Sequence, residues 1–281
     1  MVKILGKNIE IIKVSEDMPE EIYHNHPAIS KSKLSGIGEN PLKFWFWNVN
    51  PERPEKASTP AQVLGSATHY AILEPEKFKS EVVKEPKINR RTNAGKEEAA
   101  AFEEKNKGKT ILKADDYRMV MGMQEAVRKV HADMLSTISQ TEVSIFATID
   151  GANVRARMDA ISPGCIIDLK TTDDASYKGF LRSVQKYRYD VQAGLYSALY
   201  TAWKGKKPSA FWFLCVEKKS PYSTAIYKLD DDYIRHGLET FYSWLDVYIK
   251  CRDENKWPDY NNGERTTIEL PKYLREDKNA R

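Results

Sequence analysis

The chain has 281 residues, 41% hydrophobic and 30% charged, with a formal net charge of +4, which suits a globular protein and permits a nucleic-acid partner without requiring one. No apolar run approaches the ~18 residues of a membrane-spanning helix, and the N-terminus lacks the apolar region of a signal peptide, so we expect a cytosolic protein. The 3 cysteines are far apart and form no CxxC pair, which indicates neither a disulfide framework nor a cysteine-ligated metal site.

The N-terminal part of the chain predicts short elements. Residues 1–29 predict one short strand followed by a loop, and Ser30 is a candidate N-cap for the short helix that follows. Asn40 and Pro41 predict the cap and the first residue of the next helix. Its four consecutive aromatic residues, 44–47, would suit base stacking, but adjacent helix residues point in different directions, which favours core packing.

A long polar segment separates two further predicted helices. The first covers residues 60–78 and stops near Glu74–Pro75, because the residue before a proline avoids helical geometry. The second covers 115–135, and its Met and Val stripe indicates a face packed in the core. Between them, residues 84–113 mix both charge signs and predict a flexible excursion that contains a short helix.

From Glu142 the hydrophobic period changes to two, which is typical of strands. Turn signals at Asp150–Gly151 and Pro163–Gly164 divide this stretch into three strands and predict an antiparallel meander. The remaining elements are two helices, a strand pair and a long amphipathic helix, at 177–187, 189–205, 208–218, 222–229 and 230–255. This succession predicts an α/β protein.

The second turn of the meander brings two acids together. If Pro163 and Gly164 are the loop residues, Asp159 lies directly opposite Asp168 across the ladder, about 5 Å away. A longer loop would shift the register and break the pattern. A solvated strand face with ion pairs is the alternative interpretation, but like charges placed opposite each other repel, which favours a divalent cation between them. Oxygen ligands without cysteine indicate Mg²⁺, with Mn²⁺ as the other candidate.

Strand alternation extends this pair into a charged face. Lys170, Arg155 and Arg157 share the face of the two acids, while alternate apolar residues occupy the other face. The same count across the Asp150–Gly151 turn places Glu142 opposite Asp159. The sequence therefore predicts three acids and a lysine on one face of adjacent strands.

These residues resemble a known family. An aspartate at 159 followed by Asp-x-Lys at 168–170, after a short hairpin, resembles the signature of the PD-(D/E)xK nuclease superfamily. The stretch GSATHYAILEP at 65–75 resembles the G-x-x-x-H helix of the RecB-like branch, and QAGLY at 192–196 resembles its Q-x-x-x-Y motif. Together with RARMDAI at 155–161, these motifs are similar in order and wording to the exonuclease domain of RecE-type phage recombination proteins, over roughly residues 28 to 260.

The resemblance implies a role for each matched position. The metal ligands would be His69, Asp159, Asp168 and the backbone carbonyl of Leu169, with Glu142 binding the metal directly or through water. Lys170 would orient or help to deprotonate the attacking water and stabilise charge on the phosphate. Gln192 and Tyr196, at i and i+4 of one helix, would position the strand or the lysine, with core packing as the alternative for Tyr196.

The resemblance also implies the fold and its extent. We expect a restriction-endonuclease-like core, with a central mixed sheet flanked by helices. The whole chain, 1–281, would be a single nuclease domain, with an N-terminal helical part at about 28–80 and a catalytic core at about 110–255. The second acid is Asp where many superfamily members have Glu, although the RecE-like branch also uses Asp. The chain lacks the cysteine cluster of the iron–sulfur relatives, which argues against that subgroup.

The implied activity is a Mg²⁺-dependent exodeoxyribonuclease that degrades linear double-stranded DNA from the 5′ end and leaves a 3′ single strand. Its partner would be a single-strand annealing protein of the RecT type, and relatives form rings, so we expect a homo-oligomer. Such a protein would be encoded by a phage or prophage and act in the bacterial cytoplasm.

Five basic residues are candidate DNA contacts: Arg155, Arg157, Arg90, Arg91 and Lys96. The last three lie in the charged excursion, where a disordered, solvated loop is the alternative interpretation. Three other functions stay open: a single-strand or structure-specific nuclease on the same site, a non-catalytic DNA-binding module, and a structural partner of an annealing protein.

Overall fold

The computed structural model describes residues 1–54 and 57–271. The chain divides into two compact units, one of Met1–Lys31 with Glu55–Tyr242 and the other of Ser32–Pro54 with Ser243–Arg281. The prediction of a single nuclease domain stays a prediction. All the residues of the candidate site belong to the first unit.

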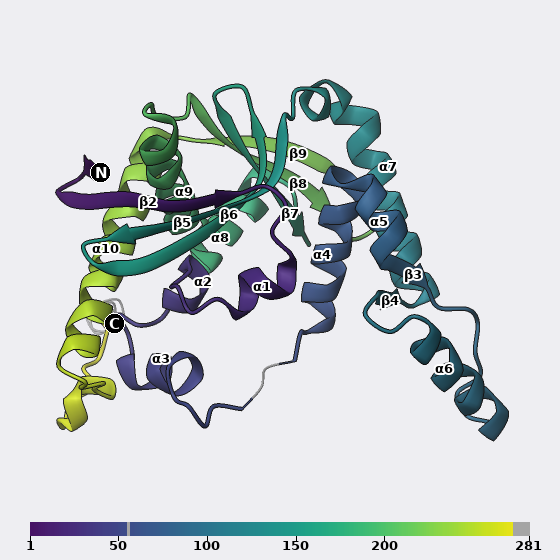
Figure 1. The fold of residues 1–281 in the computed structure, drawn as a ribbon, viewed down its shortest axis with the longest axis horizontal. Helices are drawn as coiled ribbons and strands as arrows, with labels where there is room; N and C mark the ends of the chain where they lie inside the picture. The colour runs from purple at the N-terminus through teal and green to yellow at the C-terminus, as the bar shows by residue number, and fades with distance from the viewer. Residues whose placement is uncertain (55–56, 272–281) are drawn as a thin grey trace, which may run out of the picture. The chain divides into compact units, whose positions relative to one another are not determined.

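The first unit is built on a mixed sheet (Figure 1). Within the described residues, seven strands follow the order β1-β2-β5-β6-β7-β8-β9. They are β1 (Val2–Ile4), β2 (Lys7–Ser15), β5 (Gln140–Ile149), β6 (Ala152–Ser162), β7 (Cys165–Thr172), β8 (Ala210–Glu217) and β9 (Thr224–Leu229). β7 and β8 are parallel, whereas the other neighbours are antiparallel. The predicted meander is confirmed as β5, β6 and β7, and the predicted mixed sheet flanked by helices is confirmed with it.

Helices cover both faces of this sheet (Figure 1). On one face, α4 (Pro60–Leu73) packs against β6 and β7, and α7 (Ala114–Ser136) against β8 and β9. On the other face lie α8 (Tyr177–Tyr187) and α9 (Tyr189–Lys204), and α9 packs against β2 and β6.

Successive side chains of β8 point alternately to the two helical layers on either side of the sheet. Leu214 belongs to the cluster with α4 and α7. Its neighbour Phe213 points to the opposite face, where its ring lies 5.3 Å from that of Phe180 on α8. A central strand buried on both faces therefore reads as a continuous hydrophobic run.

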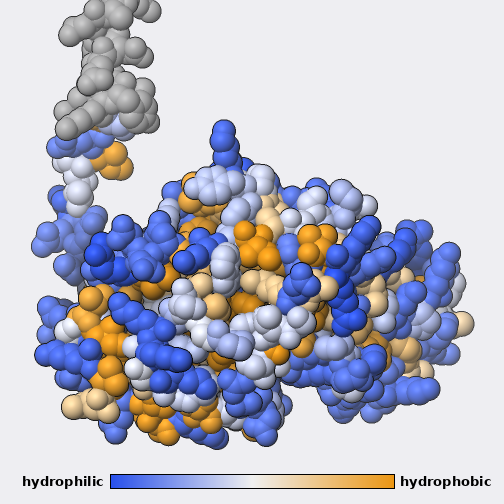
Figure 2. Space-filling view, turned by 90° about the horizontal axis from the view of Figure 1, so that it is seen from above, coloured by the Kyte–Doolittle hydropathy of each residue, from blue (hydrophilic) through white to orange (hydrophobic). Residues whose placement is uncertain are grey.

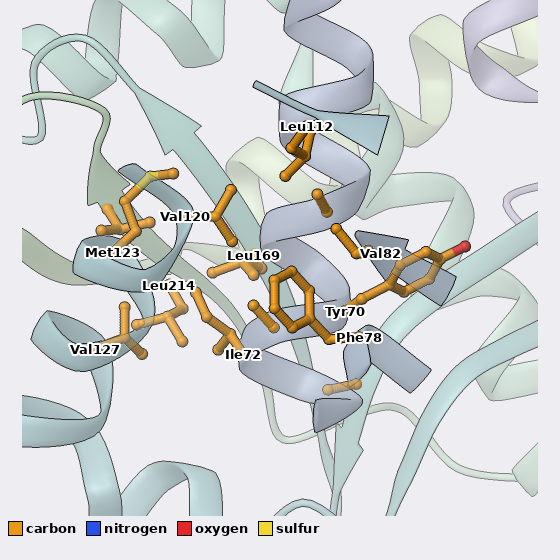
Figure 3. Packing of buried hydrophobic residues seen from close by; sticks show 14 of the residues in the cluster. Tyr70, Ile72, Phe78, Val82, Leu112, Val120, Met123, Val127, Leu169 and Leu214 are labelled. Carbon is orange, nitrogen blue, oxygen red and sulfur yellow. The ribbon is translucent and has the colours of Figure 1, made fainter. Parts of the chain in front are cut away.

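The core between α4, α7 and the sheet is shown in Figure 3. Leu169 and Leu214 of the strands meet Ile72 of α4 and Val120 of α7 there, and all four side chains are buried. At about 25 cal/mol per Å² of apolar surface, burial of one such side chain contributes about 1.5–3 kcal/mol. This cluster fixes the position of α4 relative to β7.

Helix α4 begins and ends at residues that are typical of helix starts and stops. Thr59 and Gln62 form a capping box, and Pro60 occupies the first helical turn, where its missing N–H costs nothing. The helix ends at Leu73, and α5 (Pro75–Glu81) begins at the proline. The predicted stop near Glu74–Pro75 is confirmed.

The N-terminal prediction was too simple. Residues 1–29 form two paired strands and a helix, α1 (Glu20–Asn25), where one short strand and a loop were expected. The turn between β1 and β2 consists of Leu5 and Gly6, both at positive φ. Leucine is an unusual residue for this conformation, so the sequence carried no hairpin signal.

The charged segment 84–113 is more ordered than predicted. It contains the expected helix, α6 (Asn93–Lys105). Its ends are joined by a parallel pair of short strands, β3 (Val82–Lys84) and β4 (Thr110–Leu112). Val82 and Leu112 are buried in the cluster of Figure 3, so apolar packing holds the base of the segment.

The second unit contains α2 (Lys31–Leu34) from Ser32 onwards, α3 (Pro41–Asn48), the end of α10 (Asp231–Asp253) and a 3₁₀ turn, η1 (Tyr260–Gly263). The predicted Asn40 cap is confirmed, since its side chain accepts a hydrogen bond from the Lys43 backbone. Phe44 is buried and stacks on Trp257, whereas Phe46 and Trp47 are exposed. Core packing therefore holds for only part of the aromatic run.

Hydrophilic residues predominate on the face shown in Figure 2, as expected for a chain that is 30% charged. Among the helices of the described residues, none combines the length and apolar character that crossing a bilayer requires.

Candidate metal-dependent nuclease site

The hairpin between β6 and β7 has the predicted register. Ser162 pairs with Cys165 and Ala160 with Ile167, which leaves Pro163 and Gly164 as the two loop residues. Gly164 has a φ of 80°, a left-handed conformation in which a side chain would be strained. The acids at 159 and 168 follow the last of these pairs, and their predicted direct opposition across the ladder stays a prediction.

The ladder stops just before these acids. Beyond Ala160 and Ile167, β6 and β7 form no further backbone pair with each other. Instead, the Asp159 carboxylate accepts a hydrogen bond from the Leu169 backbone N–H at 2.8 Å. The side chain thus takes the place of a ladder partner, and the strands separate where the site begins.

His69 of α4 reaches this point of separation. Its Nδ1 atom lies 3.5 Å from Oδ2 of Asp159, the same oxygen that accepts from the Leu169 backbone N–H. One ligand atom from each of His69, Glu142 and Asp159 can be chosen so that all lie within 4.8 Å of one another. The structure therefore brings together three of the predicted metal ligands and places the Leu169 backbone beside them.

Glu142 enters the site through an unusual backbone conformation. The pairs Thr141 with Ala160 and Val143 with Met158 keep one register on both sides of it. Glu142 itself has a φ of 51°, which for a non-glycine residue costs on the order of 1–3 kcal/mol. Such strain persists only where surrounding contacts stabilise it.

Asp168 and Lys170 form a second group with Gln192 of α9. Lys170 Nζ lies 2.5 Å from Oδ2 of Asp168. The Gln192 side chain donates its Nε2 hydrogen to Oδ1 of Asp168 at 2.6 Å and accepts from Lys170 Nζ at 3.1 Å. One amide therefore holds both ends of the Asp-x-Lys motif. The predicted role of Asp168 as a metal ligand stays a prediction.

Tyr196 lies in the core next to this network. Its side chain is half-buried, and its ring centroid is 6.4 Å from that of Phe211. Burial raises the pKa of Tyr196 well above its ordinary value. The contact with Phe211 favours core packing, and the predicted positioning role of Tyr196 stays a prediction.

Burial dominates the electrostatics of the acids. It raises the pKa of Glu142 to about 8 and the pKa values of Asp159 and Asp168 to about 6 each. Burial also lowers the pKa of His69 to about 4, which leaves the imidazole neutral at pH 7. Burial alone would lower the pKa of Lys170, but Asp168 and Asp159 outweigh it and hold that pKa above its ordinary value.

This donor set fits a divalent cation. A neutral imidazole offers a lone pair, and carboxylates that are costly to ionise in isolation are stabilised when a cation shares their charge. Two carboxylates and one imidazole suit Mg²⁺ or Mn²⁺, and the described residues contribute no cysteine to the group. The residues that would hold the ion directly are His69, Glu142 and Asp159.

The structure encloses the arginines at 155 and 157, two of the candidate DNA contacts. Arg155 is only 2% exposed and donates to the His24 carbonyl at 3.1 Å. Arg157 is also buried and donates to the Met18 carbonyl at 2.8 Å. Both guanidiniums lie over the ring of Tyr23. A DNA contact by either stays a prediction, and these contacts favour a role within the protein.

The other three candidate DNA contacts are exposed. Arg90 pairs with Glu85 at 2.5 Å and with Glu103 at 2.8 Å. Arg91 precedes the N-cap of α6, and Lys96 lies in that helix.

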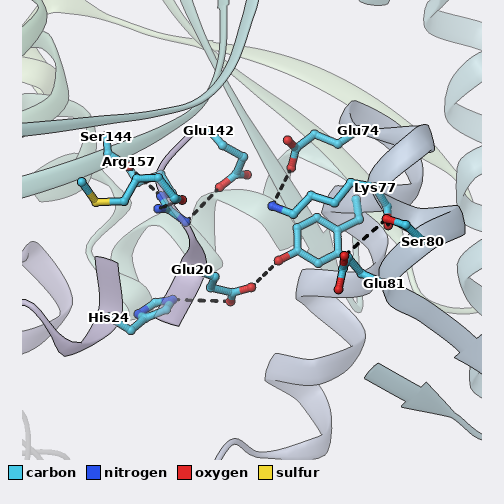
Figure 4. Close-up of polar contacts among 11 residues, drawn as sticks. Glu20, His24, Glu74, Lys77, Ser80, Glu81, Glu142, Ser144 and Arg157 are labelled. Carbon is cyan, nitrogen blue, oxygen red and sulfur yellow. Dashed lines mark hydrogen bonds and ion pairs between the residues drawn. The ribbon is translucent and has the colours of Figure 1, made fainter. Parts of the chain in front are cut away.

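Sequence reasoning missed the contacts of α1 and one tyrosine of α9. Glu20 of α1 accepts a hydrogen bond from the Tyr70 hydroxyl, and its carboxylate also contacts His24 (Figure 4). No sequence signal marked these residues, because the segment was predicted as a loop. Tyr189 lies with its ring 4.6 Å from Lys170 Nζ. Its position three residues before Gln192, on the same helix, would have indicated it.

The sheet, the Asp-x-Lys strand and the histidine helix together define a PD-(D/E)xK-type domain. The chain belongs to the family described as "PDDEXK-like domain of unknown function (DUF3799)", whose model matches residues 46–268. This confirms the predicted superfamily, that of the PD-(D/E)xK nucleases, and is consistent with its RecE-like branch.

Two solved structures are similar to this chain. One is a protein from Eubacterium rectale described as a "Putative exonuclease", with 16% identity and a TM-score of 0.64, covering 93% of this chain and 98% of that one. At this identity the likeness shows the fold alone. The other is described as SSO0001, with 14% identity and a TM-score of 0.27, covering 70% of this chain and 88% of that one. No curated protein matches the sequence.

Proposed function

We propose that this chain is a divalent-metal-dependent exodeoxyribonuclease that degrades linear double-stranded DNA from the 5′ end and leaves a 3′ single strand. The observation that carries this proposal is the half-buried group of His69, Glu142 and Asp159 beside the network of Asp168, Lys170 and Gln192. The first group suits a cation, and the second holds an ammonium next to it.

A divalent cation bound by the first group would supply Lewis-acid activation of the scissile phosphate and would neutralise charge as the phosphodiester bond breaks. The chain's own part is positioning. Asp168 and Gln192 hold Lys170 by two contacts, and its raised pKa keeps it positively charged at neutral pH. The ammonium is therefore suited to stabilise negative charge on a phosphate oxygen. This favours charge stabilisation over proton abstraction by Lys170.

The polarity of degradation, the use of Mg²⁺ and a ring-shaped homo-oligomer rest on the resemblance to RecE-type exonucleases. The same holds for an annealing partner and for an origin in a phage or prophage. The three exposed basic residues Arg90, Arg91 and Lys96 support contact with DNA phosphates outside the site. Loss of these charges should weaken DNA binding more at low salt than at high salt.

The test is a time course on linear duplex DNA labelled at either the 5′ or the 3′ end, with Mg²⁺ or with EDTA. We expect early release of the 5′ label in short products and survival of the complementary strand. We expect no cleavage in EDTA and none by Lys170→Ala. Early release of the 3′ label would reverse the polarity. Cleavage of single strands only, or internal cuts, would assign a different nuclease activity to the same residues. The absence of cleavage with both Mg²⁺ and Mn²⁺ would refute the proposed activity.

A further inference from the structure

The Arg157 guanidinium has several partners, of which Figure 4 shows Ser144 and Glu142. Its Nε donates to Ser144 Oγ at 2.9 Å, its Nη2 donates to the Met18 carbonyl at 2.8 Å, and its Nη1 lies 3.7 Å from Oε2 of Glu142. The guanidinium carbon lies 4.2 Å from the centre of the Tyr23 ring. Each of the three nitrogens therefore has its own partner, which only the planar fork of arginine allows.

These contacts link three parts of the first unit. Ser144 lies directly opposite Arg157 on β5, and Glu142 is its diagonal neighbour on the same strand. Met18 and Tyr23 belong to the segment that precedes and forms α1. The guanidinium is thus fixed on two sides by the backbone and by a neighbouring strand, while its third side meets the carboxylate.

Glu142 is the cation-site residue whose conformation most needs support. Its left-handed backbone is costly, yet the strand register is unbroken on either side. The conformation is therefore local to one residue, and a fixed partner for its side chain can stabilise it. Arg157 is that partner among the basic side chains of the described residues.

We propose that Arg157 is a positioning residue for the cation site: it holds the Glu142 carboxylate toward His69 and Asp159, and the segment Met18–Tyr23 holds Arg157. This rests on the proposed function only in assigning a divalent cation to those three side chains. The segment that includes the start of α1 would then affect the affinity of the site for the ion, because it holds Arg157 in place.

Arg155 offers a matched control. It is also buried, lies two positions away on the same face of β6, and donates to a carbonyl of the same segment, that of His24. Its guanidinium also lies over the Tyr23 ring, at 4.6 Å. The described contacts of Arg155 do not include Glu142. Removing either arginine should disturb α1, but only the loss of Arg157 should release the carboxylate.

The experiment measures Mn²⁺ binding to the metal-free full-length chain by electron paramagnetic resonance of the free ion, without DNA. The variants are Arg157→Gln, Arg157→Lys, Glu142→Gln, the double variant Arg157→Gln with Glu142→Gln, and Arg155→Gln. Circular dichroism checks that each is folded, and Arg157→Lys keeps the test open if Arg157→Gln does not fold.

We expect Arg157→Gln to weaken Mn²⁺ binding about 10- to 100-fold, the usual effect of removing a group that orients a ligand. Arg157→Lys should also weaken it, since one ammonium cannot replace three separate nitrogens. The double variant should bind as Glu142→Gln does, because Arg157 acts only through that carboxylate. Arg155→Gln should keep the wild-type Kd.

A wild-type Kd in both Arg157 variants would overturn the proposal, and so would additive losses in the double variant or an equal loss in Arg155→Gln. Mn²⁺ binding with no cleavage of any DNA would refute the nuclease activity and leave the role of Arg157 standing. Cleavage of DNA together with unchanged Mn²⁺ binding in the Arg157 variants would support the nuclease activity and refute the role of Arg157. No Mn²⁺ binding by the wild type would overturn both.

Discussion

Nζ of Lys170 lies 2.5 Å from Oδ2 of Asp168, two positions earlier on the same strand, and the carboxylate is completely buried. The pair is therefore an ion pair within the protein and not a surface contact. Breaking a buried pair by removing one partner costs far more than the pair contributes, because it leaves a charge without compensation.

The first prediction concerns this pair. Lys170→Met should lower the free energy of unfolding by about 3–5 kcal/mol at pH 8, since it leaves the buried Asp168 carboxylate without its cationic partner. Adding Asp168→Asn should recover much of this loss. Urea unfolding of the single and double variants measures both effects. A single variant as stable as the wild type would show that the pair is open to solvent.

Gln192 carries the second prediction. Gln192→Leu keeps the volume of the side chain but removes both hydrogen bonds that hold Asp168 and Lys170, so we expect kcat to fall about 10- to 100-fold with little change in KM for DNA. Gln185→Leu, on the exposed face of α8, is the control and should leave both constants unchanged. An unaltered kcat in Gln192→Leu would show that the Gln192 amide does not contribute to the reaction.

The third prediction is a dependence of stability on pH in the metal-free protein. Burial raises the pKa of Glu142 from 4.5 to about 8, so folding favours its protonated form. Its contribution to stability is fully present below about pH 4.5 and is lost as pH rises through about 8. The Tm of the wild type minus that of Glu142→Gln, measured in EDTA, should therefore fall between pH 5 and pH 9. A difference that is constant or rises with pH contradicts this assignment.

Two helical glycines carry the fourth prediction. A Cβ on Gly194 of α9 would lie 2.3 Å from the Leu238 backbone nitrogen, whereas a Cβ on Gly65 of α4 would meet nothing within 4 Å. Gly65→Ala should therefore stabilise the protein by roughly 0.5–1 kcal/mol, because alanine is the better helix former. Gly194→Ala should destabilise it by about 1–3 kcal/mol, because backbone must move. Thermal melts of both variants check this, and the same sign of change in both would refute the packing argument.

The register of the site was predictable from sequence because turn chemistry and strand alternation are local. Pro163–Gly164 and Asp150–Gly151 mark the two turns, and counting outwards from them places Glu142, Asp159 and Asp168 on one face. His69 and Gln192 could be assigned only by the resemblance, since their distance in sequence from these strands carries no geometric information.

The environment of Arg157 could not be predicted in the same way. Alternation gave its face correctly, but the burial of that face depends on α1, which lies in a segment predicted as a loop. A charged face therefore suggested contact with DNA, whereas tertiary packing encloses the side chain. The Leu5–Gly6 turn shows the same limit, because leucine at positive φ is stabilised by the pairing of β1 and β2 and not by its own preference.

The parallel pairing of β7 and β8 bears on the order of folding. Parallel neighbours need a long crossover, here α8 and α9, and Gln192 lies within it. The meander β5–β7 needs only two tight turns, so it can form early, whereas closure over residues 173–209 carries a larger entropy cost. The contacts of Gln192 with β7 should then form after the folding transition state. Gln192→Leu should accelerate unfolding and leave the refolding rate almost unchanged, with a φ-value near 0 in stopped-flow experiments.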